Sequence, residues 1–262
     1  MTERQLFNAH GTIYELPYAA SGGFRRIRPV TTHNRHISDF ASWRGLFVIA
    51  GVAASATNSS HVFRSDDGQA ALWLGNVDDL WRLGAPAGIG GPWKNSAVAA
   101  NTPSDPYLMF GYERKAMELS HTNAMPATFT VEVDFAADNT WSEYARFTVP
   151  PGQTVTHVFP DGYSAHWVRL KTDTSTSATA QFTYGPAAPQ INGAALQPSG
   201  SFLLTFTGGA GQPYIIRASS DVTVSPARWS TLATGIFSRG AAHFEDWSVT
   251  NLACRFYTIS IP

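Results

Sequence analysis

Short runs of alternating apolar and polar residues, separated by turn-forming residues, are the feature that most limits how this chain can fold. The clearest run is TFTVEVDF (128–135). Its alternation places Phe129, Val131, Val133 and Phe135 on one side of an extended strand, and Thr128, Thr130, Glu132 and Asp134 on the other. Similar runs follow at close spacing: WSEYARFTV, TVTHVFP, SAHWVRLKT and ATAQFTYG. The pattern predicts antiparallel strands with one buried face.

The first 126 residues repeat one form three times, although the residues themselves do not recur. Each unit has a polar or His-containing start, a strand, a turn and a second strand, as in HVFRSDDGQAALWLG and DPYLMFGYERKAMELSH. This repetition is typical of a β-propeller or of a meandering β-sheet. We predict an all-β protein whose domain at 1–185 is propeller-like or a meandering β-sheet.

A second domain is predicted after the stretch GPAAPQINGAALQPSG, whose Pro, Gly and Ala residues mark a boundary near residues 185–190. The short strand-like runs that follow are enough for a small β-sandwich at 186–262. Its two tryptophans, Trp229 and Trp247, are expected in the core of that sandwich.

Charge and cysteine content exclude several classes of function. The chain has 18 Lys and Arg against 19 Asp and Glu, with no basic block, so we expect no nucleic-acid partner. No apolar run approaches the roughly 18 residues of a membrane span, so no membrane insertion is expected. The N-terminal residues lack the apolar stretch of a signal peptide. Cys254 is the only cysteine, which excludes an intrachain disulfide and a thiolate metal cluster.

The stretch TTHNRHISDF (31–40) holds the first candidates for catalysis. His33 and Arg35 are two residues apart and share a face of an extended strand, whereas His36 lies on the opposite face. A guanidinium that holds a carboxylate, beside an imidazole that moves a proton, suits chemistry on a uronic acid. The alternative is that Arg35 forms a structural ion pair with Asp39.

Histidines recur near strand ends in successive units: His10, His33, His61 and His121. If the units are arranged radially, these imidazoles converge on one metal or acid–base site. The alternative is that each imidazole donates to a neighbouring carbonyl. Nucleotide, serine-hydrolase and HExxH motifs are absent from the sequence, so ordinary serine-hydrolase, zincin and dehydrogenase chemistry is not supported, and the cofactor is unknown.

Candidate ligand-binding residues lie in WRLGAPAGIGGPWKN (81–95), which we interpret as a long irregular loop. It is flanked by Trp81 and Trp93, and Lys94 and Asn95 follow. Exposed indole rings stack on sugars, so these four residues are candidates for a glycan platform. The alternative is that the tryptophans are buried as loop anchors. The paired aspartates of RSDDG and GNVDDLW are interpreted as turn formers, with calcium binding as an alternative.

Several segments carry a resemblance to known families: NAHGTIYELP, RPVTTHNRHISDFASWRGLFVIAGV, DGQAALWLGNVDDLWRLGAPAGIGGPWKN, PSDPYLMFGY and FPDGYSAHWVRLKTD. Over residues 6–184 the chain resembles the C-terminal half of large, uncharacterised bacterial propeller-like proteins linked to polysaccharide use. From SGSFLLTF to CRFYTISIP it resembles a C-terminal fibronectin/immunoglobulin-like module of secreted bacterial proteins.

This resemblance implies an extracellular or periplasmic setting and a polysaccharide or oligosaccharide partner. We therefore expect a carbohydrate-binding or carbohydrate-processing segment of a secreted bacterial polysaccharide-utilisation protein. Two alternatives stay open. One is a glycoside hydrolase or polysaccharide lyase that uses His33 and Arg35, with His10 or His61. The other is a non-catalytic structural or adhesive module. The sequence does not indicate an oligomeric state.

Overall fold

The computed structural model describes residues 5–33, 36–55, 59–186, 188–209, 212–237, 240–251 and 254–261. Within these ranges the chain forms antiparallel β-strands and a few short 3-10 helices, which confirms the all-β prediction. None of these helices has the length and hydrophobicity needed to cross a membrane. The chain divides into two compact units. One comprises Met1–Leu80 and Pro86–Gly185, and the other comprises Trp81–Ala85 and Pro186–Pro262.

The first unit begins with a three-stranded sheet in the order β1-β2-β3, formed by β1 (Leu6–Ala9), β2 (Thr12–Glu15) and β3 (Arg28–Thr32). A two-residue turn joins β1 to β2, and His10 and Gly11 adopt φ values of 49° and 77° in it. Tight hairpins require positive φ at both turn residues, so Gly11 suits this place. Two 3-10 helices separate β2 from β3: η1 (Ala19–Ser21) and η2 (Gly23–Arg26).

A four-stranded sheet follows, in the order β4-β5-β7-β6, and it comprises β4 (Phe40–Trp43), β5 (Leu46–Val52), β6 (Val62–Arg64) and β7 (Ala71–Gly75). One of its faces is buried and carries Phe47, Ile49 and Trp73. The opposite face is also apolar, since Phe63 and Leu72 pair across it and remain 55% and 43% exposed. The 3-10 helix η3 (Val77–Arg82) comes next.

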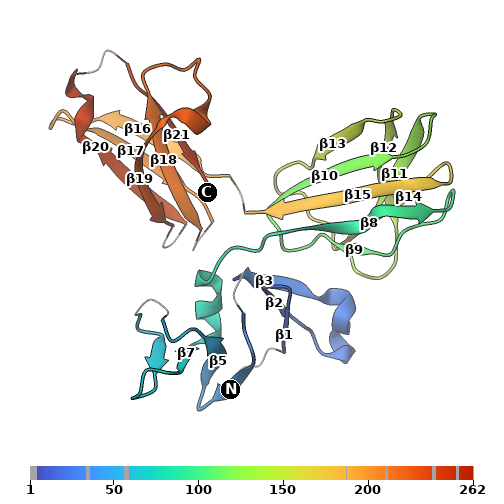
Figure 1. Ribbon diagram of the computed structural model, residues 1–262, viewed down its shortest axis with the longest axis horizontal. Helices are drawn as coiled ribbons and strands as arrows, with labels where there is room; N and C mark the ends of the chain where they lie inside the picture. The colour runs from blue at the N-terminus through green and yellow to red at the C-terminus, as the bar shows by residue number, and fades with distance from the viewer. Residues whose placement is uncertain are drawn as a thin grey trace. The chain divides into compact units, whose positions relative to one another are not determined.

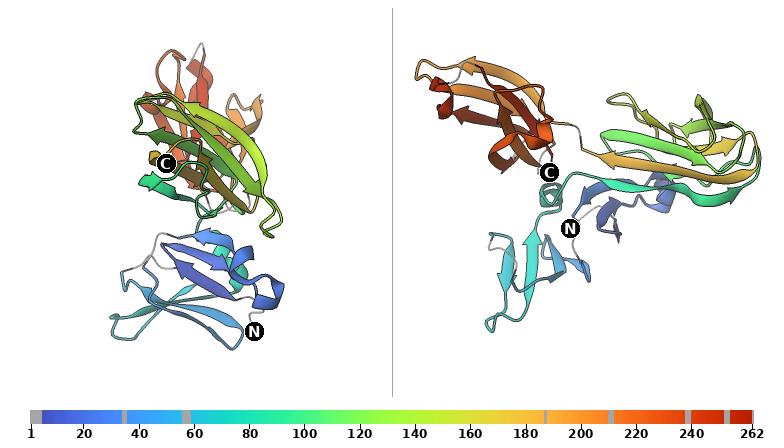
Figure 2. Two further views of the ribbon diagram at one scale, coloured as in Figure 1. Left: turned by 90° about the vertical axis from the view of Figure 1, so that its right-hand side faces the viewer. Right: turned by 45° about the horizontal axis from the view of Figure 1, so that its top comes forward.

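Residues 88–185 form two facing four-stranded sheets, which can be followed in green and yellow in Figure 1 and from other sides in Figure 2. The first sheet has the order β13-β10-β15-β8, with β8 (Gly88–Val98), β10 (Arg114–His121), β13 (Thr154–Val158) and β15 (Thr176–Gly185). The second has the order β12-β11-β14-β9, with β9 (Tyr107–Leu108), β11 (Ala127–Asp134), β12 (Ser142–Val149) and β14 (Trp167–Thr172).

This order of eight strands is that of a jelly roll. Except for the β11–β12 hairpin, each strand is followed in the chain by a strand of the opposite sheet. A propeller blade instead pairs strands that are neighbours in the sequence, so the propeller alternative is not confirmed.

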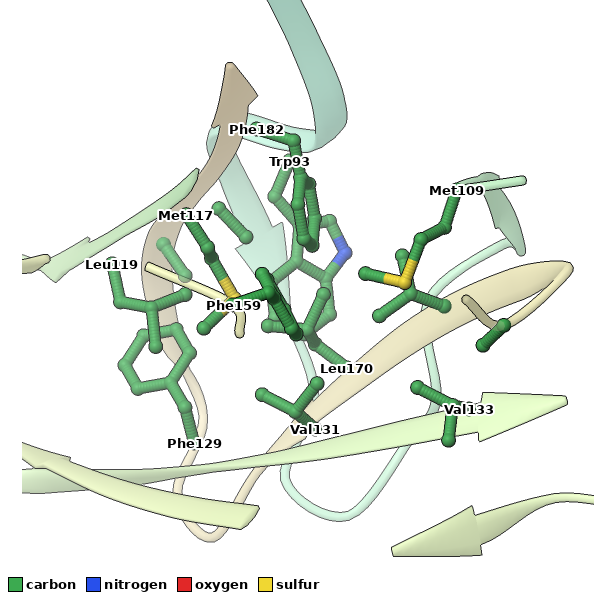
Figure 3. Close-up of a cluster of buried hydrophobic side chains, with 14 of the residues drawn as sticks. Trp93, Met109, Met117, Leu119, Phe129, Val131, Val133, Phe159, Leu170 and Phe182 are labelled. Carbon is green, nitrogen blue, oxygen red and sulfur yellow. The ribbon is translucent and has the colours of Figure 1, made fainter. Parts of the chain in front are cut away.

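The two sheets of the jelly roll enclose one hydrophobic core, shown in Figure 3. Phe129, Val131 and Val133 of β11 point into it and are at most 1% exposed, as their alternation predicted. The prediction is wrong at the end of the strand, where Phe135 is 57% exposed and Asp134 is 1% exposed. β11 ends at Asp134, and the buried carboxylate of Asp134 accepts hydrogen bonds from the N–H groups of Ala136 and Asn139. Met117 and Phe182, from the opposite sheet, complete this part of the core and are fully buried. A core side chain removed from water contributes about 1.5–3 kcal/mol, so this cluster is a major source of the unit's stability.

Residues 25–32 contact the jelly roll through hydrogen bonds to backbone groups. Nε1 of Trp167 donates to the carbonyl of Arg25 at 2.8 Å, and Nε2 of His166 donates to the carbonyl of Ile27 at 3.1 Å. Oγ1 of Thr32 donates to the carbonyl of Ala87 and accepts from its N–H, both at 2.9 Å. These contacts fix the end of β3 beside the start of β8.

The second unit contains two three-stranded sheets, β16-β17-β20 and β19-β18-β21. Their strands are β16 (Gln190–Leu196), β17 (Phe202–Thr207), β18 (Pro213–Ser219), β19 (Ser230–Ile236), β20 (Ala241–Asp246) and β21 (Phe256–Ser260), with the 3-10 helices η4 (Pro226–Arg228) and η5 (Trp247–Asn251). Leu204, Phe206, Ile216 and Phe237 form the core. Trp229 is 8% exposed, as expected, but Trp247 is 62% exposed, so its predicted burial is wrong.

Candidate functional site

His33 is a buried residue that holds the first sheet together. It is 6% exposed, its Nε2 donates to Oδ1 of Asn8 at 3.0 Å, and its backbone N–H donates to the carbonyl of Gly11 at 2.8 Å. Arg35, its predicted partner, lies outside the described residues. The contacts of His33 are those of a structural residue at the end of β3.

The other histidines are also accounted for locally. His10 occupies the exposed β1–β2 turn, which places its side chain outside any buried site. His61 stacks on Trp73 at 5.1 Å between ring centres, and its Nδ1 donates to the carbonyl of Leu74 at 2.9 Å. His121 is buried, and its Nε2 donates to the carbonyl of Val149 at 2.8 Å. Within the described ranges, no three His, Cys, Asp or Glu side chains come together as metal ligands would.

Only residues 83–87 of the stretch 81–95 form the irregular loop that its Gly and Pro residues predicted, because residues 88–95 belong to β8. Trp81 lies in η3 and is 44% exposed. Trp93 lies on β8 inside the jelly-roll core, at 7% exposure and with its ring 6.4 Å from that of Phe129 (Figure 3). The ring faces of Trp93 are covered by protein, so a sugar cannot stack on them.

β8 stays a strand because it bulges where the glycines occur. A Cβ at Gly91 would lie 1.9 Å from the carbonyl oxygen of Ala180, so only glycine lets the two strands approach here. Lys94 and Asn95 follow this bulge and are exposed. Asn95 has a φ of 51° and receives a hydrogen bond on its Oδ1 from Oγ1 of Thr179 at 3.1 Å.

The first acidic turn forms as the sequence predicted. Oδ1 of Asp67 accepts from Oγ of Ser65 at 2.6 Å and from the N–H of Gln69 at 3.0 Å. These hydrogen bonds lower the pKa of Asp67 below its ordinary value. In the second turn, Asp79 accepts from the N–H of Asn76 at 2.8 Å. Both turns therefore use a carboxylate to satisfy backbone donors.

A different group of side chains stands out on the outer face of the sheet β12-β11-β14-β9. Because Val131 and Val133 point into the core, Glu132 projects outward, and Arg169 lies directly opposite it on β14. Trp167 and Lys171 flank Arg169 on the same strand and share its face. We call Glu132, Trp141, Trp167, Arg169 and Lys171 the Trp141 face.

One carboxylate organises the cations of the Trp141 face. Nε of Arg169 donates to Oε2 of Glu132 at 2.6 Å, and Nζ of Lys171 donates to Oε1 at 2.6 Å. Burial alone would raise the pKa of Glu132, but the hydrogen bonds and charges of Lys171 and Arg169 lower it below the ordinary value. Glu132 is therefore ionised at neutral pH and holds both cations in place.

Trp141 completes the arrangement from the loop that precedes β12. The guanidinium carbon of Arg169 lies 4.2 Å from the centre of the Trp141 ring, a cation–π contact. The side chains of Arg169 and Lys171 remain 25% and 33% exposed, so solvent reaches them. An indole, two oriented cations and a carboxylate thus lie together on one accessible sheet face.

Such a face can bind a ligand that has both apolar and polar edges. Indole rings contact the C–H groups of a sugar, while charged side chains bind its hydroxyl or acidic groups. The neighbouring residues Arg146 and Glu143 on β12 pair with one another at 2.9 Å and are 65% and 45% exposed. This exposed pair contributes little to stability and stays outside the network around Glu132.

None of the predicted site residues belongs to the Trp141 face. A signal was present in SAHWVRLKT, because Trp167, Arg169 and Lys171 recur at every second position and must share one face of a strand. The outward position of Glu132 was also predicted. Their proximity was not predictable, since it depends on which strand lies beside β11.

Comparisons with known proteins give distant likenesses. No family model and no curated protein matches the chain. The Endo-D glycoside hydrolase domain from Streptococcus pneumoniae R6 is 11% identical over 63% of this chain and 32% of that chain, with a TM-score of 0.22, so this chain spans about a third of it. The PBSX exported protein XepA is 11% identical over 79% of this chain and 92% of that chain, with a TM-score of 0.29.

A fucolectin from striped bass (Morone saxatilis) serum is 9% identical over 70% of this chain and 92% of that chain, with a TM-score of 0.25. Two of these three structures are thus carbohydrate proteins by name. TM-scores of this size do not establish a common overall fold, so they carry no conclusion about what this chain binds.

Proposed function

We propose that this chain is a carbohydrate-binding segment of an exported protein that uses polysaccharides, and that the Trp141 face is its binding surface. The observation that carries the proposal is the arrangement of Trp141, Arg169 and Glu132, in which an aromatic ring, a cation and a carboxylate are fixed against one another on an accessible sheet face. The sequence resemblance to polysaccharide-related proteins favours the same class of ligand.

The geometry favours binding over catalysis. Glycoside hydrolysis requires two carboxyl groups that face one bond, roughly 5–10 Å apart. Glu132 accepts hydrogen bonds from Arg169 and Lys171, which lower the pKa of its carboxyl group. A general acid instead needs a raised pKa. The chain is therefore proposed to hold a glycan without cleaving it.

The proposal is tested by measuring binding to a panel of neutral, rhamnose-containing and uronic-acid polysaccharides by isothermal titration calorimetry. We expect Trp141→Ala to weaken binding by about two- to twelvefold, because contact with an aromatic ring contributes about 0.5–1.5 kcal/mol. Trp43→Ala is the matched control, since Trp43 is 56% exposed on β4 and also has a guanidinium, that of Arg44, 5.1 Å from its ring centre.

Trp81→Ala tests the platform that the sequence predicted. If Trp81→Ala or Trp43→Ala abolishes binding and Trp141→Ala does not, the binding surface is elsewhere and our assignment is wrong. Binding of no polysaccharide by the wild type contradicts the function itself.

A further inference from the structure

The guanidinium of Arg169 has two partners within the protein. Its Nε donates to Glu132, and its central carbon lies 4.2 Å from the centre of the Trp141 ring. Among the described residues, no acceptor hydrogen-bonds its two terminal amino groups. These groups form a planar pair of parallel donors, spaced to fit the two oxygens of a carboxylate or sulfate.

Lys171 adds a third point of attachment beside this pair. Its ammonium has three N–H donors, and the single hydrogen bond to Oε1 of Glu132 uses one of them. Arg169 and Lys171 lie on alternate positions of β14, and both reach the same carboxylate, so their free donors lie on the same side of the sheet.

The charges around the two cations leave an excess of one positive charge. Among the described residues, Glu132 is the single carboxylate that pairs with them, and the adjacent pair of Arg146 and Glu143 is neutral as a whole. The unbalanced unit charge adds a favourable electrostatic energy when an anion binds beside it. A neutral sugar does not gain this energy.

The orientation of Arg169 also reduces the entropy lost on binding. An arginine side chain that must be ordered by its ligand loses rotamer freedom on binding. Here Glu132 and Trp141 order the side chain beforehand. Glu132 contacts the Nε edge, so a ligand anion can approach the opposite end of the guanidinium at a greater distance from the carboxylate.

We propose that the Trp141 face is specific for anionic sugars, with the acidic group bound by the terminal amino groups of Arg169 and by Nζ of Lys171. This inference rests on the proposed function, because it names the class of sugar that the same surface binds. The anion is a carboxylate of a uronic acid or a sulfate ester, since both offer two or more coplanar oxygens to the donor pair.

The test compares polymers that differ only in charge, using the full chain and isothermal titration calorimetry at fixed ionic strength. Polygalacturonate is compared with the same polymer after methyl esterification, and dextran sulfate with dextran. We expect each charged polymer to bind at least about tenfold more tightly than its neutral counterpart, a difference of about 1.4 kcal/mol. Preference for one charged polymer over the other distinguishes carboxylate from sulfate.

Variants separate donor geometry from charge. Arg169→Lys keeps the charge but removes the planar donor pair, and we expect it to weaken polygalacturonate binding by about tenfold. Arg169→Gln removes both the charge and the donor pair, and we expect it to weaken polygalacturonate binding at least as much as Arg169→Lys does. Arg146→Gln is the matched control: it removes one positive charge from the same sheet face and leaves the network around Glu132 intact, so it should change affinity less than about threefold.

Two results would overturn the inference while leaving the proposed function in place. One is equal affinity of the wild type for polygalacturonate and its methyl ester, with both weakened by Trp141→Ala. The other is an equal loss of polygalacturonate affinity in Arg146→Gln and Arg169→Gln. This result would show that the net charge, and not the donor pair, attracts the polymer. If the wild type binds none of the four polymers, the function and the inference both fail.

Discussion

Two histidines of the jelly roll are kept neutral by their surroundings. Nε2 of His157 is hydrogen-bonded to the hydroxyl of Tyr144 at 2.8 Å, and His166 stacks on Phe110 at 5.0 Å between ring centres. Burial is the largest influence on both and lowers the pKa of each imidazole below 6.5. The ring of His166 lies 5.6 Å from that of Trp167, which belongs to the Trp141 face, so His157 is the better position at which to measure an effect on stability.

The pH dependence of stability follows from these lowered pKa values. When pH falls below 6.5, the unfolded chain binds protons at these histidines before the folded chain does, so the free energy of unfolding decreases until the folded pKa is passed. Urea unfolding of the wild type and of His157→Gln between pH 7 and pH 5 checks this, and the variant should lose less stability. A steeper loss in the variant would contradict it.

His33 provides a second prediction at the residue scale. Replacing a buried, hydrogen-bonded imidazole by alanine leaves the amide of Asn8 without this partner, so His33→Ala should lower the free energy of unfolding by about 1–3 kcal/mol. We expect no change in polysaccharide binding by the folded variant. Release of reducing or unsaturated products from a uronic-acid polysaccharide by the wild type, and its loss in a folded His33→Ala, would instead support the lyase or hydrolase alternative.

Strand β8 shows how one element depends on a backbone approach that side chains would prevent. The carbonyl of Ala180 occupies the place where a Cβ at Gly91 would lie, whereas nothing lies within 4 Å of a Cβ built at Gly88. Both glycines belong to the same strand and neither has a positive φ. The two positions therefore differ in the space available for a side chain and not in the sign of φ.

The matched substitutions should consequently differ in effect. Gly91→Ala should lower the free energy of unfolding by about 1–3 kcal/mol, because β8 must move away from β15 to make room. Gly88→Ala should change it by no more than about 0.5 kcal/mol. Chemical denaturation followed by tryptophan fluorescence measures both, since Trp93 lies in the core beside this bulge. Equal changes in the free energy of unfolding would contradict this prediction, because they would mean that β8 accommodates the added methyl group at Gly91 without destabilisation.

Among the described residues, the jelly roll and the second unit each have a hydrophobic core of their own. Phe182 is fully buried in the jelly roll, and Phe206 is 1% exposed in the second unit. The two clusters have no residue in common, so each unit has its own source of stability. Loss of a large aromatic side chain from one core should therefore lower the stability of the unit that contains that core.

Calorimetry checks this independence. Phe182→Ala and Phe206→Ala should each lower the stability of their own unit by about 3–5 kcal/mol and shift one of two thermal transitions. The transition of the other unit should stay in place. A single transition that moves in both variants would show that the units unfold as one cooperative body.

What the sequence determined by itself is local. Alternation along β11 predicted that Phe129, Val131 and Val133 face the core, although it wrongly placed Phe135 there too. Turn-forming residues predicted the hairpin at Gly11 and the turn at Asp67. These features depend on neighbours within a few residues. The same local reasoning failed for β8, because its Gly and Pro residues indicated a loop and the partner strand that makes room for a bulge was unknown.

Only the tertiary structure decided how the strands pair and hence where the Trp141 face lies. Glu132 and Arg169 are 37 residues apart, and the alternation of β11 and β14 is satisfied by any order of strands that buries the same faces. Apolar periodicity specifies which side of a strand is buried but not which strand lies beside it. The pairing follows from closing eight strands around one core, and that closure brings Glu132, Trp141 and Arg169 together.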